Sequence, residues 1–355
     1  MSNGNELVQS GGLGSNNTQV GQVILNQGPS VTETREIALD VFKANFYQLQ
    51  GQAQSIANSR AEEISDLVIE KLQAKHPSGF SKATDPDFQH ALFTVQKEYA
   101  RSGDRDLGEL LVDLLVDRSK EKGRSLLQIV LNESLETAPK LAPAQLSALS
   151  VVFSIAYSHG TQITSRAALE RYMTDHIQPF VDELTVEDSC YQHLEYTRCA
   201  SIAPGERNLF KILHSQYSLA FHSGNDIVEL NKLDLHPAVT FALFDTSLDN
   251  GLKFKPVVNT KSEFETILTE LPDYLLPASK HAELKKLFDS MHATISVTEF
   301  KDLILELVPF MKKLSRVWDK TSLRRLRLTS VGVAIAHANI KKNLPNDFVS
   351  LSIWI

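Results

Sequence analysis

Apolar residues between Ser30 and Leu72 recur three to five positions apart, a spacing that places them along one face of an α-helix. The pattern predicts one long helix or two collinear helices. Ser30 and Glu33 have the spacing of a capping box, which would begin the helix. Gly51 interrupts the stripe, and we expect a bend there. The apolar positions are Phe42, Phe46, Leu49, Ala53, Ile56, Ala57, Ile64, Leu67 and Leu72.

Helical spacing of apolar residues returns along most of the chain after a loop at 76–87. These patterns predict a mainly α protein built as one or more multi-helix bundles. The segment 143–158 is apolar nearly all round, which predicts a buried central helix. Residues 224–260 give mixed signals and no predicted element. Further helices are expected at 86–103, 107–115, 126–138, 164–184, 186–199, 206–222, 262–271, 279–291 and 298–314.

The two ends of the chain differ from this helical pattern. Residues 1–29 are rich in Gly, Asn, Gln and Ser, which is typical of a flexible tail. Within them, 16–28 carries Val and Ile between turn-forming residues and could instead be an assembly strand that pairs with other subunits. At the other end, 323–328 predicts a strand that a turn joins to a helix ending near Ile340. This order is typical of a small winged-helix-like α+β region.

The length of 355 residues is sufficient for two or three hydrophobic cores. We predict a tag at 1–29, a helical domain at 30–222 that begins with the long helix, and a C-terminal helical domain at 223–355.

The last five residues, LSIWI, predict a buried terminal strand or a docking tail, because they would promote aggregation if exposed.

The cysteine content, the N-terminus and the length of the apolar runs are those expected of a cytoplasmic protein. Two cysteines are too few for a disulfide framework, and the N-terminus lacks the pattern of a signal peptide. The apolar runs at 149–157 and 331–338 are too short to cross a membrane. We therefore expect a cytoplasmic protein with no membrane partner.

Positive charge is concentrated near the C-terminus of an acidic chain. Residues 311–342 carry a net charge of +8, and the remaining residues carry −15. Such a cluster could bind the phosphates of a nucleic acid. The simpler interpretation is that it balances Glu299, Asp302 and Glu306, or contacts another subunit. The candidate nucleic-acid-binding residues are Lys312, Lys313, Arg316, Lys320, Arg324, Arg325 and Arg327.

Cys190, His193 and Cys199 are the candidate metal ligands, with His214 or His222 as a fourth. A helix would place positions 190 and 193 on one face, and zinc accepts nitrogen and sulfur ligands. Two buried thiols and a core histidine explain the same residues. A cysteine nucleophile beside His193 is a further alternative, although no orienting third residue is evident. No phosphate-binding glycine motif occurs, and we expect no cofactor.

Three passages together carry a resemblance to a family of bacterial proteins of unknown function. They are NNTQVGQVILNQG with TREIALDVFKANF, the middle stretch LVDLLVDRSKEKGRSLLQIVLNESLETAPKL, and LTSVGVAIAHANIKK with LSIWI. The resemblance spans nearly the full chain. The N-terminal tag looks like those that precede helical modules in bacterial conflict and antiphage proteins, which implies a role in assembly. The resemblance transfers no catalytic motif.

These observations favour a non-enzymatic, oligomeric interaction or regulatory component, of the kind that a bacterial antiphage system contains. Self-association would use the apolar stripe at Phe42, Phe46, Leu49 and Ile56, with residues 16–28 pairing between subunits. A protein partner from the same system is also expected. The alternatives are a nucleic-acid-binding regulator that uses the basic C-terminal region, and a metal- or cysteine-dependent enzyme.

Overall fold

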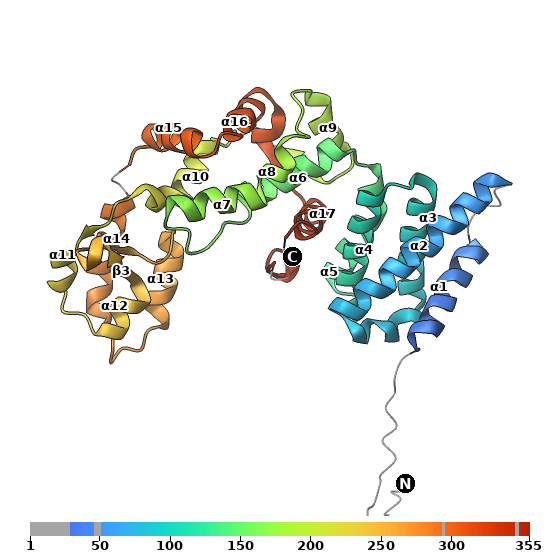
Figure 1. Cartoon of the computed structure of the whole chain (residues 1–355), viewed down its shortest axis with the longest axis horizontal. Helices are drawn as coiled ribbons and strands as arrows, with labels where there is room; N and C mark the ends of the chain where they lie inside the picture. The colour runs from blue at the N-terminus through green and yellow to red at the C-terminus, as the bar shows by residue number, and fades with distance from the viewer. Residues whose placement is uncertain (1–28, 46–50, 293–294, 345–347) are drawn as a thin grey trace, which may run out of the picture.

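The computed structural model describes residues 29–45, 51–292, 295–344 and 348–355. The protein is mainly α, as the apolar spacing predicts, and its helices form an arch (Figure 1). One end of the arch is the N-terminal lobe, which comprises residues 31–140, and the other is the small lobe, which comprises residues 218–292. A bridge of helices from residues 143–217 and 297–328 joins them, and the C-terminus lies within the concave side.

The N-terminal lobe packs five α-helices around apolar faces. Asp85, Asp104 and Ser125 each begin a helix, because their side chains accept a hydrogen bond from a free backbone N–H of the first turn. The elements are α1 (Val31–Asn45), α2 (Gln52–Lys75), η1 (Pro77–Thr84), α3 (Pro86–Ser102), α4 (Arg105–Ser119), α5 (Leu126–Thr137) and η2 (Ala138–Lys140).

The prediction of one long helix or two collinear helices is wrong, because α1 and α2 fold back against each other. Gly51 begins α2 with a φ of 61°, a left-handed conformation that glycine adopts without strain. Arg35 on α1 consequently pairs with Asp66 on α2 at 2.6 Å. Phe42 is 2% exposed and lies in a cluster with Ala57 and other buried residues. The part of the apolar stripe at Phe42 and Ala57 is therefore buried within one chain.

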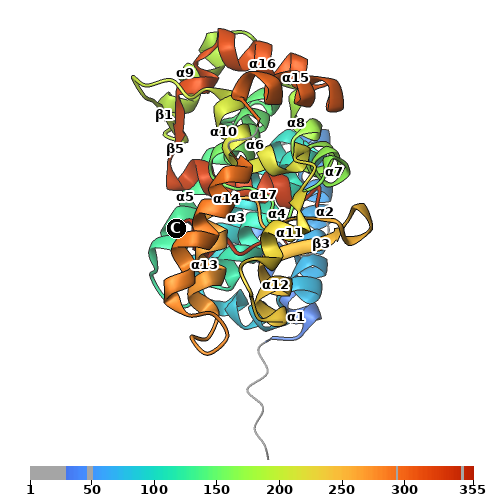
Figure 2. The same ribbon diagram turned by 90° about the vertical axis from the view of Figure 1, so that its left-hand side faces the viewer.

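The bridge consists of helices from two separate parts of the chain. Its first part contains α6 (Pro143–Ala156), α7 (Arg166–His176), α8 (Gln178–Val181), α9 (Asp188–Tyr196), β1 (Ala200–Ile202) and α10 (Leu209–Tyr217). Its second part contains α15 (Val297–Leu307), α16 (Met311–Lys320), η6 (Ser322–Arg325) and β5 (Leu326–Leu328). β1 and β5 pair antiparallel, with Ala200 opposite Leu328. Figures 1 and 2 both place α9, α15 and α16 along the outer edge of the bridge.

Helix α17 (Ser330–Lys341) follows β5 and lies at the centre of the molecule, where it packs against α4, α5 and α6. Its residues from Gly332 to Ile340 are all buried. Helix α6 is buried along most of its length, which confirms the central helix predicted at 143–158. The chain then ends in η7 (Leu351–Ile353), a short 3-10 turn that docks on the bridge.

The small lobe has a hydrophobic core of its own, which includes Phe254, Phe264 and Phe288. Its strands form an antiparallel sheet in the order β2–β4–β3. The elements are η3 (Ser218–Phe221), β2 (Asn225–Asp226), α11 (Ile227–Asn231), α12 (Pro237–Leu243), β3 (Phe244–Leu248), η4 (Asp249–Gly251), β4 (Lys253–Pro256), α13 (Lys261–Glu270), η5 (Ala278–Lys280) and α14 (His281–His292).

Two expectations about the C-terminal region need correction. The residues predicted as one domain at 223–355 divide between two hydrophobic clusters, because those from Phe300 onward join the main core. The strand and helix of the predicted winged-helix-like region exist as β5 and α17. However, β5 pairs with the distant β1, and α17 is buried, so neither is presented as a wing or a recognition helix. None of the described helices is long and apolar enough to cross a membrane.

Gly332 provides a test of how closely α17 must approach Cys199, the residue that precedes β1. A Cβ atom at this position would overlap the Cys199 carbonyl oxygen and lie 2.9 Å from the carbonyl carbon. We expect Gly332→Ala to lower the free energy of unfolding by about 2–3 kcal/mol, since backbone cannot move aside as a flexible side chain can. Urea denaturation measures this change.

Gly205→Ala is the matched control, because among the described residues no atom lies within 4 Å of a Cβ built there. Its free energy of unfolding should stay within about 0.5 kcal/mol of the wild-type value. Equal effects of the two substitutions would contradict the close packing of α17 against Cys199.

Candidate functional site

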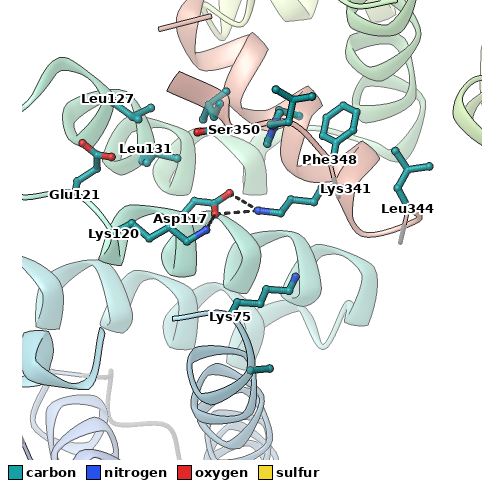
Figure 3. A pocket seen from close by; sticks show the side chains of 14 residues that line it. Lys75, Asp117, Lys120, Glu121, Leu127, Leu131, Lys341, Leu344, Phe348 and Ser350 are labelled. Atoms are coloured by element: carbon teal, nitrogen blue, oxygen red, sulfur yellow. Dashed lines mark hydrogen bonds and ion pairs between the residues drawn. The ribbon is translucent and has the colours of Figure 1, made fainter. Parts of the chain in front are cut away.

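A pocket of about 580 Å³ opens on the concave side of the arch, between α4 and α5 on one side and α17 with the C-terminal tail on the other (Figure 3). We use the name C-terminal tail for residues 348–355. The pocket combines three lysines with an apolar wall, and its volume is within the range of small-molecule sites. Its lining includes Lys75, Lys120, Lys341, Leu127, Leu131 and Phe348.

Two aspartates lie one helical turn apart on α4 beside this pocket, and each is paired with two lysines. Asp113 accepts from Lys71 Nζ at 2.8 Å and from Lys75 Nζ at 3.0 Å. Asp117 accepts from Lys120 Nζ at 2.6 Å and from Lys341 Nζ at 3.0 Å. We call these groups the Asp113 triad and the Asp117 triad. They join α2, α4 and α17 at the edge of the pocket.

The lysines keep Asp117 ionised although it is largely buried. Burial alone would raise the pKa of this carboxyl, but the charges of Lys341 and Lys120 outweigh it and hold the pKa below its ordinary value of 3.8. The Asp117 side chain is 12% exposed, so solvent screens these charges only in part. Each triad has two lysines and one aspartate, so it keeps a net charge of +1 beside the pocket at neutral pH.

His337 forms part of the pocket wall on the α17 side. Its Nε2 donates to the Val349 carbonyl oxygen at 2.8 Å. Its buried Nδ1 has no hydrogen-bond partner among the described residues. Burial lowers the pKa of this imidazole, so the ring is neutral at pH 7 with its proton on Nε2. Nδ1 is consequently an acceptor, but it is buried and exposes almost no surface.

The C-terminal tail is held by specific polar and aromatic contacts. Trp354 Nε1 donates to the Tyr157 carbonyl oxygen at 2.8 Å, and its ring centroid lies 4.9 Å from that of Phe153 in an edge-on arrangement. The His337 and Phe348 rings are 4.9 Å apart. The predicted docking tail is therefore present, and it forms a 3-10 turn in place of the alternative terminal strand.

A second pocket, of about 570 Å³, lies on the other side of the tail. Residues from the end of α7 and the start of α8, including His176 and Pro179, line it. The two pockets share Leu344 and Phe348 as lining residues. A molecule bound in either pocket would thus contact the same short segment that leads into the tail.

The arginines predicted to bind nucleic acid are structural in large part. Arg325 Nε donates to the Ala203 carbonyl oxygen at 2.8 Å. Arg327 donates to the Gly205 carbonyl oxygen at 3.4 Å, and Arg324 pairs with Glu206 at 2.8 Å. Together they hold the loop after β1 against β5, so their contacts stabilise the bridge.

Four of the residues predicted to bind nucleic acid are on α16, and all four are exposed. They are Lys312, Lys313, Arg316 and Lys320. Lys312, Arg316 and Lys320 are four residues apart and share one helical face. None of these three has an ion pair among the described residues, whereas Lys313 pairs with Asp182 at 3.1 Å. A compact basic stripe therefore remains on the outer edge of the bridge.

The candidate metal ligands do not converge. His193 Nδ1 accepts from Gln145 Nε2 at 2.9 Å, Cys190 is half-buried, and Cys199 is buried. Burial raises the pKa of both thiols, which disfavours the thiolate that a metal or a nucleophilic reaction needs. His214 donates to the Ile295 carbonyl oxygen, and His222 accepts from the Gly224 N–H. In the described part of the chain, no three His, Cys, Asp or Glu residues form a metal-binding group.

The predicted self-association stripe is only partly available. Phe42 is buried within its own chain, so it cannot contact a second copy without unfolding of α1. Ile56 is 44% exposed and remains a surface residue. Phe46, Leu49 and the segment 16–28 lie outside the described residues.

The pocket cannot be predicted from the sequence, because its charged residues are far apart in the chain. His337 and Lys341 are four residues apart, which places both on one face of α17. That spacing was a usable signal, since a histidine and a lysine are unusual within an otherwise apolar helix. Their partners, Val349 in the tail and Asp117 on α4, could be identified only from the structure.

A protein-family model matches residues 28–355, and the chain belongs to that family. The description of the family, “:-like”, names no activity, ligand or partner. The match covers nearly the whole chain, as the sequence resemblance implied. No curated protein and no solved structure matches the chain.

The Asp117 triad leads to a prediction about pH. We expect Asp117→Asn to lower the free energy of unfolding by about 2 kcal/mol at pH 7, because Lys120 and Lys341 would lose their shared counter-ion. The folded-state pKa lies below 3.8, so this stabilisation is complete above that pH and is lost as the pH falls through the folded-state pKa. Urea denaturation at pH 7, 5 and 3.5 measures the difference.

Asp182→Asn is the control, because Asp182 is 88% exposed and pairs with a surface lysine. Its cost should be below about 0.5 kcal/mol at every pH. A cost for Asp117→Asn that does not shrink in acid would show that the carboxylate charge is not what stabilises α17 against α4.

Proposed function

We propose that this protein is a non-enzymatic interaction or regulatory component whose C-terminal tail responds to what binds the concave side of the arch. The observation that carries the proposal is that one short segment both forms a wall of the pocket and is itself docked by a small set of contacts. The resemblance of the N-terminal tag supports placing this role in a bacterial antiphage system. Oligomerisation belongs to the proposal through Ile56, which stays on the surface.

The tail combines anchoring with exposure, as expected of a regulated segment. Leu351 is buried, but Val349 is 51% exposed and Ile353 is 66% exposed. Apolar side chains at this level of exposure contribute little to the stability of the docked state, and they are available to a protein partner. Because Val349 also accepts the hydrogen bond of His337, a change at the pocket wall reaches the tail directly.

Site-specific crosslinking tests this proposal. A photo-crosslinking amino acid at position 349 or 353, with the protein at its native level in its own cells, should yield the same discrete partner adduct from both sites. The same substitution at Tyr196 on α9, which is 84% exposed, is the control and should not give that adduct. Adducts from all three positions, or from none, would contradict a specific partner surface at the tail.

The basic stripe on α16 favours nucleic-acid binding as a second candidate function. Lys312, Arg316 and Lys320 are exposed on one face and have no ion pair among the described residues, so their charges are available to phosphates. The other predicted arginines bind backbone carbonyls or pair with Glu206, so reversing them would disturb the bridge. The α16 residues are therefore the better test.

In a mobility-shift assay at low salt, the wild-type protein should retard duplex DNA. The triple variant Lys312→Glu, Arg316→Glu and Lys320→Glu should not, because up to about three phosphate contacts would be lost. The control with Lys122→Glu, Lys232→Glu and Lys286→Glu changes the net charge equally at other exposed positions and should bind like the wild type. Absence of a wild-type shift, or equal loss in both triple variants, would exclude an α16 nucleic-acid site.

A further inference from the structure

The two triads place more positive than negative charge beside the pocket. Four lysines surround two aspartates, and each aspartate can neutralise only one of them. Glu121 also lines the pocket, and its carboxylate accepts from Ser125 Oγ at 2.8 Å. Lys342 and Asp106 form a neutral pair nearby, at 3.3 Å. The groups facing the pocket thus keep a net positive charge after all these pairs are considered.

Three of the four lysines also contact the pocket itself. Lys75 is on α2, Lys120 directly follows α4 and Lys341 is on α17, and Figure 3 shows the three side chains around the same pocket. Their side chains are between 20% and 40% exposed, so they are partly withdrawn from water. An anion among them would be attracted more strongly than at an open surface, because fewer water molecules screen the charges.

The opposite part of the lining is apolar. Leu127 and Leu131 are on α5, and Leu344 and Phe348 are near the tail. Inorganic phosphate alone would leave this surface without contact.

We infer that this pocket binds a small organic anion, with its acid group among Lys75, Lys120 and Lys341 and its apolar body against Leu127, Leu131 and Phe348. The inference rests on the proposed function, because it names the class of ligand that would act on the tail. A pocket of about 580 Å³ has room for an aryl or short alkyl group in addition to the acid group.

Phenyl phosphate is a suitable probe, and its binding can be measured by isothermal titration calorimetry on the full chain. Phenyl phosphate should bind at least roughly tenfold more tightly than inorganic phosphate, because only it fills the apolar part of the pocket. Benzyl alcohol, which has a similar ring but no charge, should bind at least roughly tenfold more weakly than phenyl phosphate. The affinity of the wild-type protein for phenyl phosphate should also fall as salt is added.

The Asp113 triad supplies a matched pair of variants. Lys71 and Lys75 both pair with Asp113, but only Lys75 is among the pocket-lining residues. Lys75→Gln and Lys71→Gln each leave Asp113 with one lysine, so the net charge changes equally and the buried carboxylate stays paired. We expect Lys75→Gln to weaken phenyl phosphate binding roughly tenfold and Lys71→Gln to weaken it less than about threefold.

Several results would overturn the inference. These are no binding of phenyl phosphate to the wild-type protein, equal affinity for inorganic phosphate or benzyl alcohol, or equal loss of affinity in the two lysine variants. If a variant unfolds, which circular dichroism would reveal, the ligand comparison and the salt dependence on the wild-type chain still decide the result. Partner adducts at positions 349 and 353 without phenyl phosphate binding would reject the ligand class while retaining the proposed interaction role.

Discussion

The burial of α17 is the constraint on which the rest of the structure depends. This helix begins after residue 329, yet it lies among helices from the first half of the chain. At Gly332 the backbone of α17 lies closer to Cys199, the residue before β1, than any residue with a Cβ atom would allow. Asn339 also donates to Ser150 on α6 at 2.9 Å, which satisfies two polar groups inside an apolar contact. The main core therefore requires both ends of the described chain.

The position of α17 also explains the candidate site. The same helix carries His337 and Lys341, and its packing brings them to α4 and to the C-terminal tail. Without α17, Asp117 would keep only Lys120, and the pocket would lose one wall. The link between core packing and pocket geometry means that a ligand acting on this wall would act on an element that stabilises the whole fold. The regulatory role proposed for the tail rests on its position beside this element.

The small lobe is attached through hydrogen bonds in addition to apolar contacts. Asn259 donates to the Gly160 carbonyl oxygen at 2.8 Å, and Lys255 donates to the Thr164 carbonyl oxygen. The Gly160 N–H in turn donates to Tyr217 at 3.0 Å. The loop between α6 and α7 thus serves as the attachment point of the small lobe. Because the lobe has its own hydrophobic cluster, these polar contacts orient it on the bridge.

Local pattern was sufficient to predict most helices, the buried α6, the strand before α17 and a docking tail, because apolar spacing and capping residues act over a few positions. It was not sufficient at Gly51, where an apolar stripe fits a straight helix and a hairpin equally well, and the hairpin forms because it buries Phe42. Three features depend on contacts between distant segments. They are the lysine–aspartate triads, the partners of the arginines, and the division of the C-terminal residues between two cores. The spacing of residues along the chain does not predict such contacts. The pocket can therefore be identified only from the tertiary structure, which brings α2, α4, α17 and the tail together.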